Sequence, residues 1–275
     1  MLYHSMTTIS MFTAGVTLLF IWFGSGKNPF VAGYSFIREL ITSRTFLILF
    51  LVMVGVLLMN SYELKWEAHL TNLTDFTPLF HQIEGDFVKN FQQFFHWRPI
   101  TEITAFFYII VLQALLIASM GIYAADKNRT YVHAVCYTVI INYVIAIPFY
   151  LFFPIHEVWS YAPAGVSFYM HEVFPGFDTI YRPLSGIDNC FPSLHTSISV
   201  SMAILAVRSG NKRWAACAVL SATIIVFAIF YMGIHWLIDM SGGLVLAVVA
   251  TSLAIRLAER STPRLRAPHA VGSSL

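Results

Sequence analysis

The sequence predicts an all-α, polytopic integral membrane protein, and three observations lead to that fold class. Hydrophobic residues make up 57% of the 275-residue chain. Only 11% of the residues are charged, whereas soluble domains carry about 25%, and the mean hydropathy is +0.70. The apolar residues also form long runs of the kind that cross a bilayer as helices.

Seven apolar segments predict a bundle of about six to seven transmembrane helices. They are Ile9–Gly24, Thr45–Asn60, Ile103–Ala125, His133–Phe153, Ser193–Val207, Trp214–Ile234 and Trp236–Ile255. The second and fifth segments are short for a span and are expected to extend into their flanks. A signal peptide is the alternative for the first segment. A retained helix is favoured there, because residues 1–10 contain no Lys or Arg and no small-residue cleavage site follows.

The basic residues predict the orientation of the helices. Residues 25–44, 125–132, 208–213 and the tail from residue 256 hold 12 of the 16 Lys and Arg residues. Because cytoplasmic loops are enriched in these residues, we expect the N-terminus outside and the C-terminus inside, with the plasma membrane as the location. The net charge of +2 thus reflects the orientation of the helices in the membrane, and no nucleic-acid partner is expected.

Three regions are predicted along the chain. Residues 1–100 hold the N-terminal membrane helices and an outer segment, residues 101–260 form the membrane core, and residues 261–275 form a flexible basic cytoplasmic tail. The outer segment repeats apolar side chains at helical spacing, which predicts an amphipathic helix in the interface. These side chains are Phe76, Leu79, Phe80, Ile83, Phe87, Phe91, Phe94 and Phe95. The helix is either a lipid-facing rim or a structural collar.

Five polar residues are predicted to meet at the outer ends of the helices. Ser193 and His195 open the fifth span. The short loop after that span makes the fifth and sixth spans an antiparallel hairpin, so the sixth brings the chain back to His235 at the same level. Asp239 follows four residues later, and Arg182 arrives from the preceding outer loop, where it is the only cation apart from histidines.

This set of residues suits phosphate chemistry. A helix N-terminus attracts phosphate, and Arg182 can donate two parallel hydrogen bonds to phosphoryl oxygens. Asp239 can fix the tautomer of His235, which can then attack phosphorus, while His195 moves protons. Two alternatives remain open: a metal site made by both histidines and Asp239, and a His–Asp pair that merely satisfies its own hydrogen bonds. The three cysteines suggest neither a disulfide nor a zinc site.

The motifs resemble those of the type-2 phosphatidic acid phosphatase superfamily. Arg182–Pro183 is similar to the end of its first motif, Pro192–His195 to its second, and Tyr231–Gly243 to its third. The resemblance implies a phosphatidic acid phosphatase type-2-like core with His235 as nucleophile, Asp239 as its orienting partner and His195 as acid and base. It also implies Arg182 and Ser193 as phosphate binders, a phosphohistidine intermediate, and neither metal nor cofactor.

The chain departs from the family pattern at four positions. Pro175 and Ile229 stand where the family has cations, Ala228 where it has serine, and Leu194 where it has glycine. This pattern resembles the inositol phosphorylceramide synthase-like, or inositolphosphotransferase, branch. Possible accessory hydrogen-bonding residues are Tyr181, Asn189 and Tyr231.

The predicted function is that of a membrane enzyme acting on lipid-linked phosphate at the outer face. It is either a lipid phosphatase or a phosphoalcohol transferase of the inositol-phosphate type. The expected substrates are a phospholipid, a sphingolipid or a polyprenyl phosphate. The alternative is a non-catalytic lipid-binding or transport protein on the same scaffold, which the missing cations would favour.

Overall fold

The computed structural model describes residue 3 and residues 5–67 and 73–262. Within these ranges the protein is helical and has no strand, which confirms the predicted fold class. The predicted tail lies outside the described residues from residue 263 onward. The α-helices are α1 (Met6–Ser25), α2 (Pro29–Thr42), α3 (Arg44–Glu67), α4 (Thr77–Glu84), α5 (Phe87–Phe95), α6 (Arg98–Phe106), α7 (Leu112–Ala125), α8 (Arg129–Phe152), α9 (Met170–Val173), α10 (Phe177–Ile180), α11 (Leu194–Arg208), α12 (Lys212–Tyr231) and α13 (Leu237–Ser261).

Five helices are each long and apolar enough to cross a membrane. They are α1, the continuous stretch of α6 and α7, α8, α12 and α13. Helices α2 and α3 meet the same test only as a pair, which is bent by 104°. Helix α11 is apolar but has only 15 residues, a rise of about 22 Å. It does not extend into its flanks as predicted, because Ser193 caps its start and Ser209 ends it.

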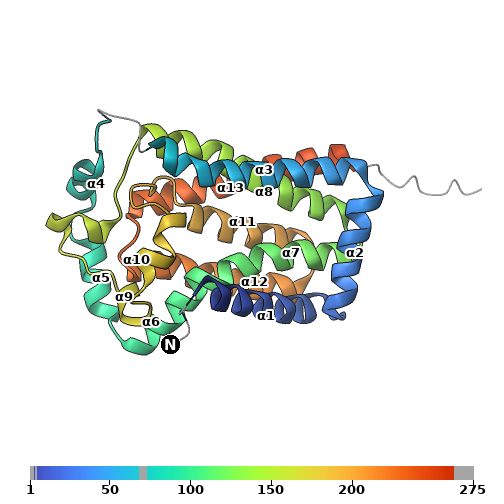
Figure 1. Cartoon of the computed structure of the whole chain (residues 1–275), viewed down its shortest axis with the longest axis horizontal. Coiled ribbons are helices and arrows are strands. Elements are labelled where there is room, and N and C mark those ends of the chain that lie inside the picture. Colours follow the sequence, from blue (N-terminus) through green and yellow to red (C-terminus); the bar gives the residue numbers. More distant parts are fainter. Residues whose placement is uncertain (1–2, 4, 68–72, 263–275) are drawn as a thin grey trace, which may run out of the picture.

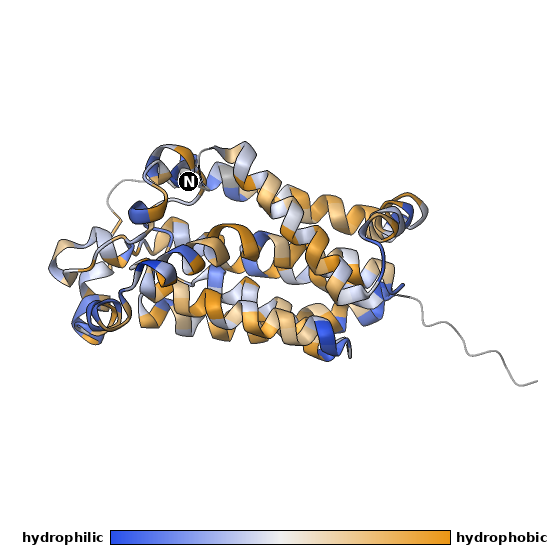
Figure 2. Ribbon diagram, turned by 90° about the horizontal axis from the view of Figure 1, so that it is seen from below, coloured by the Kyte–Doolittle hydropathy of each residue, from blue (hydrophilic) through white to orange (hydrophobic). Residues whose placement is uncertain are grey.

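The long helices run side by side, and the shorter helices and the connecting segments lie at the two ends of the bundle (Figure 1). Helix α13 packs against α8 and α11, α11 against α12, α3 against α8, and α1 against α7. Hydrophobic residues dominate the middle of the helices, and hydrophilic residues gather at their ends (Figure 2). Helix α2 crosses one end, and the segments with α4, α5, α9 and α10 cover the other.

Side-chain bonds join the basic segments at the α2 end. The Lys27 ammonium lies 2.7 Å from the Asp126 carboxylate, and the Tyr131 hydroxyl donates to the Arg208 carbonyl at 2.6 Å. Segments that the charge bias assigns to one side of the membrane therefore share one end of the bundle. Which side that end faces stays a prediction. The predicted loop 25–44 is largely helical, since it contains α2.

The predicted amphipathic helix is in fact two helices, α4 and α5. The chain breaks at Gly85, whose φ of 58° suits glycine better than other residues. Phe91 packs inward, with its ring centroid 5.1 Å from that of Phe227 in α12. Ile83 is 64% exposed and Phe94 is 82% exposed. One face of the segment is therefore a collar on the bundle, and the other is an apolar rim.

Candidate active site

His235 and Asp239 form a buried pair where α12 gives way to α13. Gly233 adopts a φ of 75° in the turn between these helices, and a Cβ there would lie 2.7 Å from the Ser167 carbonyl oxygen. The His235 Nδ1 lies 3.4 Å from the Asp239 Oδ2, which also accepts the Trp236 backbone N–H at 2.8 Å. This contact directs Nδ1 toward the carboxylate and leaves Nε2 as the nitrogen for chemistry.

His195 faces the same cavity as His235. The cavity has a volume of about 240 Å³ and is lined by both imidazoles, whose ring centroids are 5.8 Å apart. The His195 ring stacks on Tyr108 with centroids 4.0 Å apart and planes at 11°. Tyr108 belongs to a single π-helical turn, Phe107–Val111, between α6 and α7. Such turns are frequent at functional sites.

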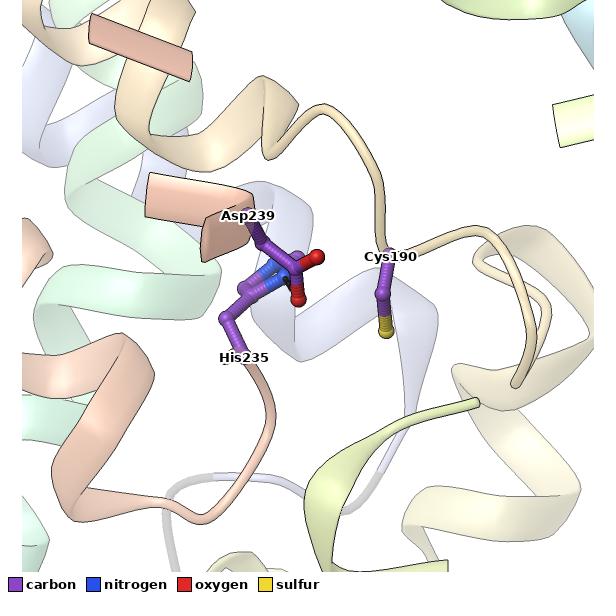
Figure 3. A group of neighbouring side chains, drawn as sticks. All are labelled: Cys190, His235 and Asp239. Carbon is purple, nitrogen blue, oxygen red and sulfur yellow. Dashed lines mark hydrogen bonds and ion pairs between the residues drawn. The ribbon is translucent and has the colours of Figure 1, made fainter. Parts of the chain in front are cut away.

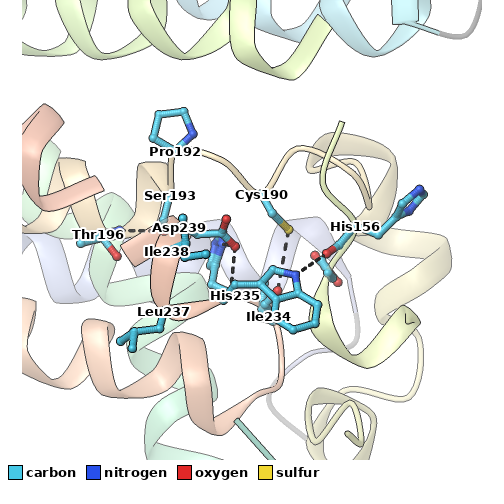
Figure 4. A network of polar contacts seen from close by, with 12 residues as sticks. His156, Cys190, Pro192, Ser193, Thr196, Ile234, His235, Leu237, Ile238 and Asp239 are labelled. Carbon is cyan, nitrogen blue, oxygen red and sulfur yellow. Dashed lines mark hydrogen bonds and ion pairs between the residues drawn. The ribbon is translucent and has the colours of Figure 1, made fainter. Parts of the chain in front are cut away.

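The N-terminal ends of α11, which carries His195, and of α13, which begins just after His235, are joined directly. The Ser193 backbone N–H donates to the Asp239 carbonyl at 3.1 Å, and the Ser193 Oγ accepts the Thr196 N–H at 3.3 Å. Figure 4 shows Ser193, Thr196 and Asp239 together at this junction. Gly243 makes the approach possible, because a Cβ there would lie 2.6 Å from the Ser193 carbonyl oxygen.

Glu84 from α4 caps the N-terminus of α13. Its two carboxylate oxygens accept the backbone N–H groups of Leu237 at 2.7 Å and Ile238 at 2.6 Å. A carboxylate at this position also interacts favourably with the helix dipole. The segment of α4 and α5 therefore helps to hold the helix on which Asp239 lies.

Arg182 does not line the cavity and is paired with Glu157. The Arg182 Nη1 lies 2.6 Å from the Glu157 Oε1 and 2.9 Å from the Gly186 carbonyl oxygen. The Trp159 indole N–H donates to the other Glu157 oxygen. Burial raises the pKa of the Glu157 carboxyl, and Arg182 and Trp159 oppose that rise by stabilising the carboxylate. Glu157, and not Arg182, is the charged group on the cavity wall.

The three predicted accessory residues divide between two places. Tyr181 and Asn189 line the cavity. The Tyr231 hydroxyl instead bonds the Thr101 hydroxyl at 2.8 Å, and Tyr231 is not among the described lining residues. Ser193 and Asp239 are also absent from the described lining. Ser193 bonds the Asp239 carbonyl, and the Asp239 carboxylate contacts His235. The structure thus unites the predicted histidines in one cavity and connects Asp239, Ser193 and Arg182 to it indirectly.

Asn189 connects the cavity to α3. Its amide donates to the Glu63 carboxyl at 3.1 Å. Glu63 lies just beyond Arg44–Asn60, the apolar part of α3. Its side chain is buried, and burial raises its pKa from 4.5 to about 7, although the bond from Asn189 lowers it.

Cys190, His235 and Asp239 form a group with metal-ligand chemistry (Figure 3). One ligand atom from each lies within 4.8 Å of the others. The predicted metal alternative had His195 in place of Cys190. Burial raises the pKa of the Cys190 thiol, so a metal ion would have to displace the thiol proton and compete with the contact between His235 and Asp239.

Sequence reasoning did not find Tyr108, Glu84 or the role of Glu157. Glu157 was visible only as one of four carboxylates in the outer loop. Glu84 contacts residues more than 150 positions away, and no local pattern indicates such a contact. Tyr108 lies within an apolar run. Its contact with His195 depends on the π-helical turn, which the sequence pattern does not indicate.

Comparison with known proteins identifies the family. The model described as the PAP2 superfamily matches residues 74–253, more than half of the chain. No curated protein and no solved structure matches the chain.

We expect Glu84→Gln to weaken the start of α13. The amide keeps one acceptor oxygen and turns an NH₂ group toward the second backbone N–H. The free energy of unfolding should fall by about 1–2 kcal/mol, and turnover should fall with it. Thermal unfolding in detergent micelles and activity assays measure both. Gln82→Ala, at an exposed position of the same helix, is the control, and equal behaviour of the two variants would contradict the capping role.

Gly243→Ala should disturb the junction of α11 and α13. The added methyl group meets backbone at Ser193, which cannot rotate away, so overpacking should cost about 1–3 kcal/mol. Gly15→Ala in α1 is the control, because no atom outside its own helix lies within 4 Å of its Cβ position. That change should stabilise the protein by up to about 1 kcal/mol through helix propensity. Similar melting temperatures for both variants would rule out the close contact.

Glu63 should make stability depend on pH. Its pKa is 4.5 in the unfolded chain and about 7 in the folded protein, so the folded protein binds the proton more tightly. The contribution to stability is full below pH 4.5 and is lost as pH rises to about 7. Glu63→Gln should remove this part of the pH dependence of the melting temperature. Glu102→Gln, at an exposed carboxylate of α6, should keep it, and identical pH profiles of native protein and Glu63→Gln would refute the assignment.

Proposed function

The chain belongs to the PAP2 superfamily, and from this membership and the site geometry we propose that it is a membrane phosphotransferase or phosphatase acting on lipid-linked phosphate. Membership itself establishes a membrane protein of the phosphatase and phosphotransferase type. One observation carries the proposal further. Two imidazoles open into one cavity, and one of them contacts a buried carboxylate four residues away.

The proposed reaction has two steps. In the first, the His235 Nε2 attacks phosphorus, a P–N bond forms, and the P–O bond to the leaving alcohol breaks as His195 gives that oxygen a proton. Asp239 supports the positive charge that develops on His235. In the second step an acceptor hydroxyl gives its proton to His195 and attacks phosphorus, and the P–N bond breaks. Water as acceptor gives a phosphatase, and a lipid or polyol hydroxyl gives a transferase.

The size of the cavity supports a headgroup as the bound part of the substrate. Sites for drug-sized ligands have volumes of about 300–1,000 Å³, so 240 Å³ suits a phosphate with a small alcohol. The acyl or prenyl chains would then lie outside the cavity, among the helices and the lipid. The absence of Lys and Arg among the described lining residues supports a donor of the phosphoalcohol type, as in the inositolphosphotransferase branch. We place the reaction at the outer face, in agreement with the charge bias.

Purified protein incubated with labelled phosphatidic acid, polyprenyl diphosphate and phosphatidylinositol tests the reaction class. Released inorganic phosphate identifies a phosphatase, and a new phosphorylated lipid in the presence of acceptor identifies a transferase. Absence of turnover with every donor would favour the lipid-binding alternative and refute the proposal.

We expect His235→Ala to abolish turnover and His195→Ala to reduce it by about 10²–10⁴-fold. The nucleophile has no substitute in the cavity, whereas slow proton transfer to solvent can replace His195. His96→Ala is the control, because His96 is half-exposed and bonds Glu172 outside the cavity. Turnover by folded His235→Ala at the native rate would exclude the phosphohistidine mechanism. Melting temperatures establish that each variant is folded.

A further inference from the structure

The cavity has an unusual charge balance for a phosphate site. Among the described residues that line it, none is Lys or Arg, and Glu157 is the only acidic one. The other polar side chains of the wall are histidines, a thiol, and neutral hydroxyl and amide groups. A phosphate that reaches His235 therefore meets a carboxylate and no unpaired cation.

The charge of Arg182 is already compensated from two sides. Besides the contact with Glu157 at 2.6 Å, its Nε lies 3.5 Å from the Asp178 Oδ1. Its guanidinium also lies among three aromatic rings, with Cζ at 4.8–5.6 Å from their centroids. These contacts fix Arg182 behind Glu157. A swing toward substrate would leave a buried carboxylate without its partner, which is costly.

Glu157 is fixed in a position where it acts on the reacting centre. Arg182 and Trp159 hold both of its oxygens, and its side chain is buried. The titratable groups that interact with its charge are Arg182, His235, Tyr108 and Cys190. Because His235 is one of them, a phosphoryl group on that imidazole experiences the field of the carboxylate.

We propose that Glu157 is a specificity-determining residue that selects phosphodiester donors over phosphomonoesters. A monoester carries about −1.5 to −2 charges at neutral pH, and a diester carries one. Glu157 lies on the cavity wall and Arg182 behind it, and at Tyr108 and Cys190 the charge of Glu157 acts more strongly than the opposing charge of Arg182. The net repulsion by the nearer carboxylate grows with the charge of the substrate. This inference rests on the proposed function and names its donor class.

The first step is then defined more closely. The P–O bond to the lipid alcohol breaks, that oxygen takes a proton from His195, and the phosphoalcohol remains on His235 through a P–N bond. A hydroxyl group then replaces His235 and returns its proton to His195. No oxidant, reductant or further reactant is needed.

Glu157→Gln tests the inference because it removes the charge and keeps the shape of the side chain. The measured quantity is kcat/KM for a phosphatidylinositol donor divided by kcat/KM for phosphatidic acid. We expect this ratio to fall at least about tenfold in the variant, mainly through faster use of phosphatidic acid. Glu172→Gln is the matched control in the same outer segment. Glu172 bonds His96 and does not line the cavity, so the ratio should stay at its native value.

A second measurement uses the native protein and does not depend on folding of the variant. Isothermal titration compares a dodecylphosphonate with its monomethyl ester between pH 5.5 and 8.5. Only the phosphonate acquires a second negative charge between these pH values. The ratio of its affinity to that of the ester should therefore fall about tenfold as the pH rises from 5.5 to 8.5. Titration of protein groups affects both ligands and largely cancels in the ratio.

The outcomes separate the two proposals. Turnover of neither donor by the native protein removes the proposed function and the specificity with it. Turnover with an unchanged donor ratio in folded Glu157→Gln, or a relative affinity that is independent of pH, overturns the specificity alone. A reduced ratio in Glu157→Gln, together with the pH-dependent loss of phosphonate affinity, supports it.

Discussion

The close contact between the N-terminal turns of α11 and α13 is the constraint on which the site depends. The two helices are separated along the chain by α12, and their junction helps to bring His195 and His235 to one cavity. A backbone hydrogen bond from Ser193 to the Asp239 carbonyl and the missing side chain of Gly243 make the contact. Precise placement of catalytic groups therefore comes from backbone packing, which holds position better than flexible side chains do.

Carboxylates organise the surroundings of that junction. Glu84 and Asp239 occupy the donors at the start of α13, and Glu157 neutralises Arg182. The site is consequently poor in free positive charge, although the proposed substrate is an anion. The His–Asp pair and the geometry of the cavity must then supply much of the stabilisation that cations give elsewhere. A substrate of low charge fits this arrangement best.

Hydropathy and spacing were sufficient to predict the helical class, a helix in each of the seven apolar segments and the meeting of the two histidines, although five of the described helices, or six with the bent pair, are long and apolar enough to cross a membrane. Each of these follows from local sequence plus the antiparallel hairpin of α11 and α12. The bend between α2 and α3, the break at Gly85 and the cap from Glu84 depend on tertiary contacts that periodicity does not report. Arg182 shows the same limit: its residue type indicated phosphate binding, but its partner Glu157 became visible only in three dimensions.

The cap that Glu84 places on α13 links the His235–Asp239 pair to the apolar rim. Ile83, the neighbour of Glu84, is largely exposed, and the same short helix holds the backbone next to the His–Asp pair. A thinner bilayer, a different sterol content or a detergent belt would act on that rim before it acted on the reacting atoms. In the proposed reaction, lipid composition would therefore act as an effector of the rate as well as the solvent of the substrate.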